Sequence, residues 1–271
     1  MTEFLEVAGG RTAYDATGEG PLVVLAPGVG DLRATYRSLV PGLVAAGYRV
    51  ATTDLRGHGE SSTGFASYAN AACGSDLAAL IRHLGGGPAV VFGNSFSGGT
   101  AVWLAANEPD LVAGLVLEGA FTRPTEPSAF QSLALALVGR SPALWGMYYR
   151  SLYPGPKPDD FAAYLAALKA NLREPGRLAS MRAMLSGTKG DLAGALGRST
   201  APALVVMGAK DKDFPDPRAE ADTIAAEHGG RTEIAMIDGA GHYPHAQFPD
   251  ETLAAVLPFL REVAPVRNGG E

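Results

Sequence analysis

The sequence predicts an α/β fold in which a mostly parallel, eight-stranded sheet is covered by helices on both faces. Over the first 120 residues, short continuous runs of Val, Leu and Ala, such as residues 22–26 and 89–92, alternate with stretches of helical periodicity. This alternation is typical of parallel strands that are buried on both faces. It stops between residues 122 and 199, where only helical patterns occur, and resumes at residue 203. These observations predict one sheet interrupted by a helical block after the sixth strand.

The expected strands fall into two kinds. Residues 2–7 and 12–17 alternate in polarity around the Gly9-Gly10 turn, which predicts a hairpin. The other six strands are short and mainly apolar, over residues 22–26, 48–53, 89–92, 111–117, 203–207 and 233–237. Helices are expected between and after them over residues 36–46, 68–84, 96–107, 217–228 and 250–263.

The helical block is rich in Leu, Ala, Met and aromatic residues and is broken by Pro and Gly. Its clearest pattern places five apolar side chains on one helical face, namely Phe161, Tyr164, Leu165, Leu168 and Leu172. Shorter helices are expected over residues 133–138, 144–149 and 178–185. The chain is therefore expected to divide into a core of residues 1–121 and 200–264, the block of residues 122–199, and a disordered tail of residues 265–271.

Composition and charge exclude several classes of protein. The 271 residues are 46% hydrophobic and 18% charged, a balance that suits a globular protein with a large core. The net charge is −6 and the 22 Lys and Arg residues are scattered, which argues against nucleic-acid binding. Cys73 is the single cysteine, so a disulfide framework and a Cys-rich zinc site are both excluded. Without a basic leader or a membrane-length apolar run, we expect a soluble, cytoplasmic protein that needs no cofactor and contacts no membrane.

The strongest local motif is Gly93-Asn94-Ser95-Phe96-Ser97, which lies between an apolar strand and a helix. A nucleophile on a sharp strand-to-helix turn needs small residues two positions before and after it, because larger side chains would collide with neighbouring elements. Gly93 and Ser97 meet this need, and Ser95 is therefore the candidate nucleophile. The alternatives are an ordinary Gly/Ser-rich turn and a phosphate-binding loop, but the sequence contains neither of the common nucleotide-binding glycine motifs.

A serine hydroxyl is a weak nucleophile until a base removes its proton, so we looked for a histidine. His242 follows the last expected strand and lies at the edge of the sheet where Ser95 is expected, which makes it the candidate base. His83 and His228 lie near helix ends and are expected to be surface or capping residues. His245 is expected to be a packing or supporting residue.

The base in turn needs a carboxylate that fixes its tautomer. Asp211 stands just beyond the seventh strand and is the first candidate. Asp213 is the nearest competitor, although we interpret it as a solvated turn residue, and Glu118 at the end of the sixth strand is the third. A metal site that combines His242, His245 and the two aspartates has no standard ligand spacing, so no metal is expected.

These motifs, in this order along the chain, resemble the α/β-hydrolase superfamily, and the resemblance covers nearly the whole chain. It implies an α/β-hydrolase fold with a catalytic triad of Ser95, Asp211 and His242, in the family's chain order of nucleophile, acid and base. It also implies that the block of residues 122–199 is a lid inserted after the sixth strand.

The resemblance further implies an oxyanion hole formed by two backbone N–H groups, those of Phe96 and Val29. The family commonly has His-Gly in the loop that carries the second donor, where this chain has Pro27-Gly28. Because the donor is a backbone group, this change need not abolish the hole. Residues 54–62 match a structural loop of the family, so His58 is expected to be structural.

A serine at the elbow favours acyl transfer, whereas an aspartate there would indicate an epoxide hydrolase or a dehalogenase. We therefore expect a serine hydrolase that cleaves an ester or a similarly activated carbonyl. The apolar, aromatic and Met-bearing lid predicts a medium-sized hydrophobic small-molecule substrate, and the candidate pocket residues are Trp145, Tyr148, Tyr149 and Met184. Two alternatives remain open: a C–C bond hydrolase or cofactor-free haloperoxidase-like enzyme with the same triad, and a slow-turnover ligand receptor or signalling protein.

Overall fold

The computed structural model describes residues 1–85, 87–124, 137–187 and 190–266. These residues form an eight-stranded sheet in the order β1-β2-β4-β3-β5-β6-β7-β8. β1 pairs antiparallel with β2, and β2 with β4, whereas every pairing from β4 to β8 is parallel. The strands are β1 Glu3–Val7, β2 Gly10–Thr17, β3 Leu22–Ala26, β4 Arg49–Thr53, β5 Ala89–Asn94, β6 Val112–Glu118, β7 Ala203–Gly208 and β8 Thr232–Ile237. The predicted mostly parallel α/β fold is confirmed.

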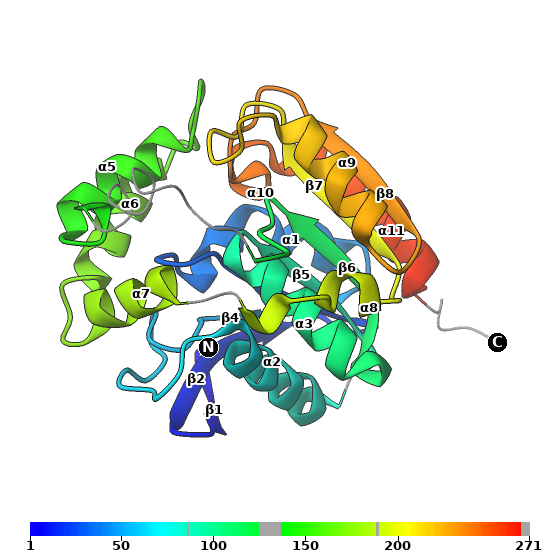
Figure 1. Cartoon of the computed structure of the whole chain (residues 1–271), viewed down its shortest axis with the longest axis horizontal. Helices are drawn as coiled ribbons and strands as arrows, with labels where there is room; N and C mark the ends of the chain where they lie inside the picture. The colour runs from blue at the N-terminus through cyan, green and yellow to red at the C-terminus, as the bar shows by residue number, and fades with distance from the viewer. Residues whose placement is uncertain (86, 125–136, 188–189, 267–271) are drawn as a thin grey trace.

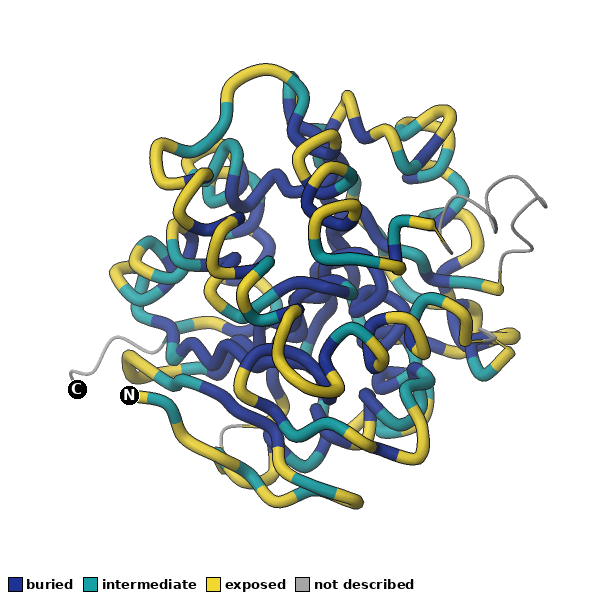
Figure 2. The backbone as a smooth tube through the Cα atoms, turned by 90° about the vertical axis from the view of Figure 1, so that its left-hand side faces the viewer, coloured by how far each residue is buried: buried dark blue, intermediate teal, exposed yellow. Residues whose placement is uncertain are grey.

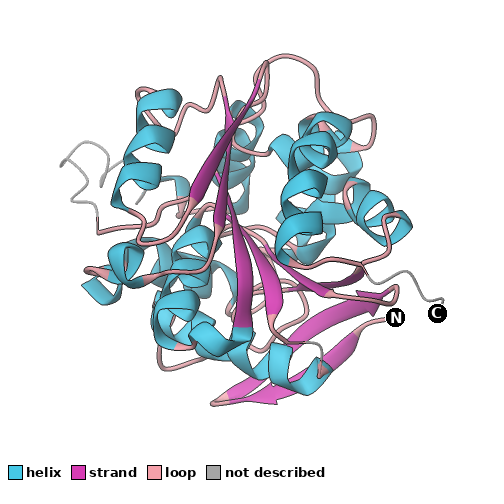
Figure 3. Cartoon of the chain, turned by 90° about the vertical axis from the view of Figure 1, so that its right-hand side faces the viewer, coloured by secondary structure: helices cyan, strands magenta, loops and turns pink. Residues whose placement is uncertain are grey.

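The side chains of each central strand point alternately into two separate cores. Val24 and Val91 pack on one face of the sheet against α2, α3, α8 and α9, whereas Val23 and Phe92 pack on the other face against α1 and α11. Figure 3 shows these helices on both sides of the twisted sheet. The helices are α1 Val40–Ala45, α2 Asn70–Leu84, α3 Phe96–Asn107, α8 Ala195–Arg198, α9 Pro217–Glu227 and α11 Pro249–Val263. Double-sided burial explains why these strands are apolar throughout rather than alternating.

The helical block lies between β6 and β7 and has a core of its own. Its longer helices are α5 Pro142–Ser151, α6 Phe161–Asn171 and α7 Arg177–Ser186, which lie together beside the sheet on the left of Figure 1. All five apolar residues that share the predicted helical face are buried in the core of the helical block. Residues 133–136 of one predicted helix, and residues 267–271 of the predicted tail, lie outside the described residues.

The structure differs from the predicted elements at several places. The single helix expected over residues 36–46 is a 3-10 helix, η1 Arg33–Ser38, followed by α1, which begins beside Pro41. Proline lacks the N–H that a continuous helix would need at this position, so a new helix starts there. A short helix that the sequence did not indicate, α10 Pro244–Gln247, follows the last strand.

Burial is concentrated at the centre of the molecule, where the strands lie, and exposed positions follow the outer faces of the helices (Figure 2). Within the described ranges, no helix is both long enough and apolar enough to cross a membrane. The parallel strands end at one edge of the sheet, and this edge is where the candidate nucleophile, base and acid lie.

Candidate active site

Ser95 lies on a sharp turn between β5 and α3. It has φ 56° and ψ −120°, and it is the one non-glycine residue with a positive φ among the residues that the structure describes. A side chain in this backbone region is strained, and such strain is concentrated at functional sites. A Cβ atom on Gly93 would lie 2.2 Å from the carbonyl oxygen of Ser97, so the turn requires glycine there.

Hydrogen bonds to the next strand and its loop hold the strained residue in place. The Ser95 N–H donates to the Glu118 carbonyl at 2.9 Å, and the Phe121 N–H donates to the Ser95 carbonyl at 3.1 Å. The Ser95 side chain stands at the N-terminus of α3, where the partial positive charge of the helix favours a developing negative charge.

His242 and Asp211 form a buried pair at the same edge of the sheet. His242 Nδ1 lies 2.7 Å from Asp211 Oδ2, and both side chains are almost fully buried. The acid is placed by a tight turn after β7, in which the Asp211 N–H donates to the Gly208 carbonyl at 3.1 Å. The helical block holds the base, because the Leu152 carbonyl accepts a hydrogen bond from the His242 N–H at 3.1 Å.

Gly119 lies beside the His242–Asp211 pair and directly follows the residue whose carbonyl binds the Ser95 N–H. A Cβ atom on this glycine, which has φ +50°, would lie 3.1 Å from His242 Nδ1 and 3.2 Å from Asp211 Oδ2. Asn94, beside the nucleophile, donates from Nδ2 to the His242 carbonyl at 3.1 Å. The structure thus joins His242 to Asp211, and the Asn94 side chain links the residue before Ser95 to this pair. The catalytic roles of Ser95, His242 and Asp211 stay predictions.

The charge state of His242 depends on two opposing effects. Burial alone would lower its pKa, but the negative charges of Asp211 and Asp213 outweigh burial and raise the pKa to about 9. Asp211 thus lies at the ring nitrogen where a carboxylate would fix the Nδ1–H tautomer and stabilise the imidazolium form, and its role as the acid stays a prediction.

The other two candidate acids have different positions. Glu118 is fully buried and faces His245, whose backbone N–H and Nδ1 both bond to the carboxylate. His245 Nε2 in turn lies 2.9 Å from Thr35 Oγ1. Asn94 Nδ2 links this pair to the candidate site, because it donates to Glu118 Oε2 at 3.2 Å as well as to the His242 carbonyl. The interpretation of Asp213 as a solvated turn residue is wrong, because its side chain is only 15% exposed and lies 3.7 Å from His242 Nε2.

The site contains one group of side chains whose atoms are close enough to bind a cation. Asp211, Asp213 and His242 each offer a ligand atom, and these atoms lie within 4.8 Å of one another. The 2.7 Å contact between the His242 and Asp211 atoms is, however, a hydrogen bond, which already engages both groups. His245 faces Glu118 and is not part of this group. We therefore assign the group to acid–base chemistry rather than to a metal.

The two candidate oxyanion donors flank Ser95. Phe96 is the first residue of α3, so its N–H has no partner within the helix. Val29 follows Gly28, where a Cβ atom would lie 3.5 Å from Ser95 Oγ. The loop of Val29 is fixed on its far side by the Gly30 N–H, which donates to His58 Nε2 at 2.9 Å. His58 is thus bonded to this loop, in agreement with a structural role.

This chain departs from the family pattern at Pro27-Gly28 and at Ser97, and these two positions contact one another. Ser97 stands where the family usually has glycine, and its buried hydroxyl donates to the Pro27 carbonyl at 2.5 Å. This bond joins the first turn of α3 to the loop that carries Val29. The sequence shows both departures, but not that they form a pair.

Replacing Ser97 with Ala is expected to lower kcat by about 10- to 100-fold, because the loop that holds the Val29 N–H loses its bond to α3 and donor position strongly affects rate. We expect KM to change little, and steady-state kinetics on any accepted ester would check both values. Ser75→Ala, on an exposed face of α2, is the matched control. An unchanged kcat in Ser97→Ala would show that the bond does not position the donor.

The helical block contacts the same loop through its aromatic side chains. Trp145 Nε1 donates to the Gly30 carbonyl at 3.0 Å, and the Tyr149 hydroxyl donates to Asp31 Oδ2 at 3.1 Å. Tyr149 is fully buried within the core of the block. Burial raises the pKa of Asp31, and hydrogen bonds from Tyr164, the Leu32 N–H and Tyr149 oppose this increase.

The other candidate pocket residues, Met184 and Tyr148, contact residues next to the candidate nucleophile and the candidate acid. Met184 is buried in a small cluster with Phe96, Leu55 and Cys73. The Tyr148 hydroxyl donates to Asp213 Oδ1 at 2.7 Å. Their contact with a substrate stays a prediction.

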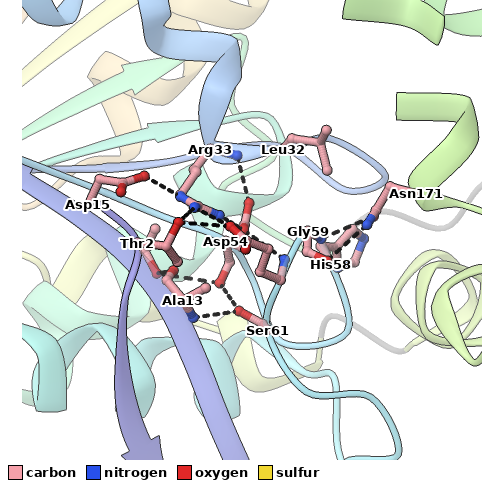
Figure 4. Close-up of polar contacts among 12 residues, drawn as sticks. Thr2, Ala13, Asp15, Leu32, Arg33, Asp54, His58, Gly59, Ser61 and Asn171 are labelled. Carbon is pink, nitrogen blue, oxygen red and sulfur yellow. Dashed lines mark hydrogen bonds and ion pairs between the residues drawn. The ribbon is translucent and has the colours of Figure 1, made fainter. Parts of the chain in front are cut away.

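Charged side chains fix the loop after β4, as Figure 4 shows. The Arg33 guanidinium pairs with Asp15, Asp54 and Glu60. A cavity of about 420 Å³ opens beside this network, and Arg33, Arg37 and Asn171 are among its lining residues. None of the predicted catalytic residues lines it.

Two histidines differ in burial. His83 is exposed and lies 3.0 Å from the Tyr14 hydroxyl. His228 caps the end of α9 but is buried, with Nε2 3.1 Å from Ser199 Oγ, so the surface alternative is wrong for this residue.

Comparisons with known proteins bear on the family and the fold of the chain. A family model described as the alpha/beta hydrolase fold matches residues 21–185. The chain is 27% identical to the 2-(acetamidomethylene)succinate hydrolase of Mesorhizobium japonicum, over 90% of this chain and 89% of that protein. Its structure is similar to that of a hydrolase from Pseudomonas aeruginosa, with a TM-score of 0.81, 27% identity, and coverage of 96% of this chain and 98% of the other. A thermophilic esterase from Thermogutta terrifontis gives a TM-score of 0.81 at 24% identity, over 97% of this chain and 99% of the other, which shows a shared fold.

Proposed function

The chain belongs to the α/β hydrolase fold family, and from this premise we propose that it is a serine hydrolase that forms an acyl-enzyme on Ser95. Its substrate is an ester or a similarly activated carbonyl compound of medium size and hydrophobic character. The observation that carries the proposal is the strained Ser95 backbone beside the buried His242–Asp211 pair. An ordinary turn would not need this conformation.

The proposed reaction begins with proton transfer. Asp211 holds the Nδ1–H of His242, which leaves Nε2 to take the proton from Ser95 Oγ as the oxygen attacks the substrate carbonyl carbon. The N–H groups of Phe96 and Val29 stabilise the negative charge that develops on the carbonyl oxygen. His242 then gives its proton to the leaving group, and in the second half of the cycle it activates the water that hydrolyses the acyl-enzyme.

The proposed substrate class rests on the helical block. Trp145 and Met184 are buried next to the oxyanion loop and Phe96, and both are apolar surfaces suited to an acyl or aromatic group. These contacts support the proposal that the block acts as a lid.

A series of p-nitrophenyl esters of graded acyl chain length tests the proposal. We expect hydrolysis with a preference for medium-length acyl chains, together with covalent labelling by a fluorophosphonate probe. A preference for esters with a charged acyl group, or for glycosidic substrates, would contradict the substrate class.

The alternatives have distinct signatures in the same screen. Turnover of a vinylogous diketone but not of esters would indicate the C–C bond hydrolase. Turnover far below the order of one per second, with a protein partner captured only when ligand is present, would indicate a receptor.

A further inference from the structure

Asp213 lies near the ring nitrogen of His242 that is opposite to the one bonded by Asp211. The carboxylate of Asp211 bonds Nδ1 at 2.7 Å, whereas Asp213 Oδ2 lies 3.7 Å from Nε2. The imidazole therefore stands between two carboxylates. The two residues are also hydrogen-bonded to each other, because the backbone N–H of Asp213 donates to Asp211 Oδ1 at 3.0 Å.

The helical block fixes the direction of Asp213. The Tyr148 hydroxyl of α5 donates to Asp213 Oδ1 at 2.7 Å, and Asp213 Oδ2 lies 3.7 Å from His242 Nε2. Burial and the charge of Asp213 raise the pKa of Tyr148, so its hydroxyl stays protonated and keeps this donor role. Asp213 is thus bonded to Tyr148 of α5 and to Asp211 in the loop after β7 rather than extended into solvent.

Nε2 is the nitrogen that exchanges protons with the nucleophile and the leaving group in the proposed reaction. A carboxylate at this edge attracts the protonated imidazole and repels other anions. It also attracts a leaving group that carries a positive charge, and it can accept a hydrogen bond from one with an N–H or O–H group.

Resting on the proposed function, we propose that Asp213 is a specificity-determining residue whose charge stabilises the proton that His242 Nε2 receives from Ser95, and that it selects against substrates with an anionic leaving group. The class it favours is an ester or thioester whose leaving group is cationic. Asp213 is not a substitute for Asp211, because the two carboxylates face opposite nitrogens of the ring.

The other ionisable groups around His242 do not replace Asp213. Glu118 acts on the ring only through its charge and is bonded to His245. The Tyr243 ring contacts His242 edge-on, and its hydroxyl stays neutral because burial raises its pKa. Among these groups, as the structure describes them, Asp213 is the one whose carboxylate lies near Nε2 and also accepts a hydrogen bond from the helical block.

The first measurement is a pH titration of His242 by NMR in protein with labelled histidine, with the signal assigned by its loss in His242→Gln. Asp213→Asn keeps the size of the side chain and an acceptor for Tyr148. We expect it to weaken proton binding to His242 about tenfold, which lowers its pKa. Asp222→Asn, which removes an equal charge from the exposed side of α9, should leave the titration unchanged.

The second measurement compares two butyryl thioesters that share an acyl group and differ in leaving-group charge, S-butyrylthiocholine and S-butyrylmercaptoacetate. The wild type is expected to prefer the cationic thioester in kcat/KM, and Asp213→Asn to reduce this preference about tenfold. The acid limb of the pH–rate profile should also shift to lower pH in this variant, because a less basic His242 is deprotonated at lower pH.

The outcomes separate this proposal from the function on which it rests. An unchanged titration of His242 in Asp213→Asn overturns the proposal, whether or not the thioesters are hydrolysed. If the pKa of His242 falls but the preference for the cationic thioester is unchanged, the proposed role of Asp213 in substrate selectivity is overturned. Absence of Ser95-dependent turnover would instead refute the proposed serine hydrolase, and the titration would still decide the role of Asp213.

Discussion

Replacing Ser95 with Ala is expected to abolish covalent labelling by a fluorophosphonate probe and to lower kcat for ester hydrolysis on the order of a millionfold. The hydroxyl is the proposed site of the acyl-enzyme, and the strained turn at φ 56° presents it at the N-terminus of α3 beside the His242–Asp211 pair. Because alanine fits the same turn at least as well, we expect the fold to remain intact.

The labelling experiment needs a control that separates the nucleophile from other serines. Ser75 lies on an exposed helical face, so Ser75→Ala should be labelled and should turn over substrate like the wild type. Thermal unfolding of both variants checks that the chain is folded. Continued labelling of Ser95→Ala would mean that the nucleophile lies elsewhere in the chain.

The strands and their order along the chain could be predicted because each one is determined locally. The run from Leu22 to Ala26 is apolar throughout since both faces of β3 are covered, and this requirement is visible in five consecutive residues. The turn at Gly93 and Ser95 is equally local, because the need for small residues follows from the strand-to-helix geometry itself. Such features need no knowledge of what the distant parts of the chain contribute.

The role of Asp213 could not be predicted because it depends on contacts across the chain. The partner that directs its carboxylate, Tyr148, lies 65 residues away in the helical block. The bond between Ser97 and Pro27 spans 70 residues in the same way. A polar residue after a strand is usually solvated, and only the folded structure shows which one is covered. Sequence patterns therefore predicted the candidate catalytic residues. They did not predict the residues, such as Asp213 and Ser97, that are proposed to influence the charge or position of those catalytic groups.

Replacing Asp211 with Asn is expected to lower kcat by about 10³- to 10⁴-fold. Asn offers Nδ1 of His242 an N–H group in place of a carboxylate oxygen, which favours the wrong tautomer, and it removes the negative charge that stabilises the imidazolium form. The pKa of His242, held at about 9 by the two carboxylates, should also fall. Steady-state kinetics across pH measures both effects.

The comparison that decides the identity of the acid is between Asp211→Asn and Asp213→Asn at a pH above the acid limb of both variants. There His242 is already deprotonated, so loss of the carboxylate at Nε2 should cost little, whereas loss of the one at Nδ1 still leaves the ring without its orienting partner. Asp238→Asn, at an exposed position in the loop of His242, controls for the change in charge. A larger loss in Asp213→Asn than in Asp211→Asn would reassign the acid, because it would mean that the ring turns its other nitrogen to Ser95 during catalysis.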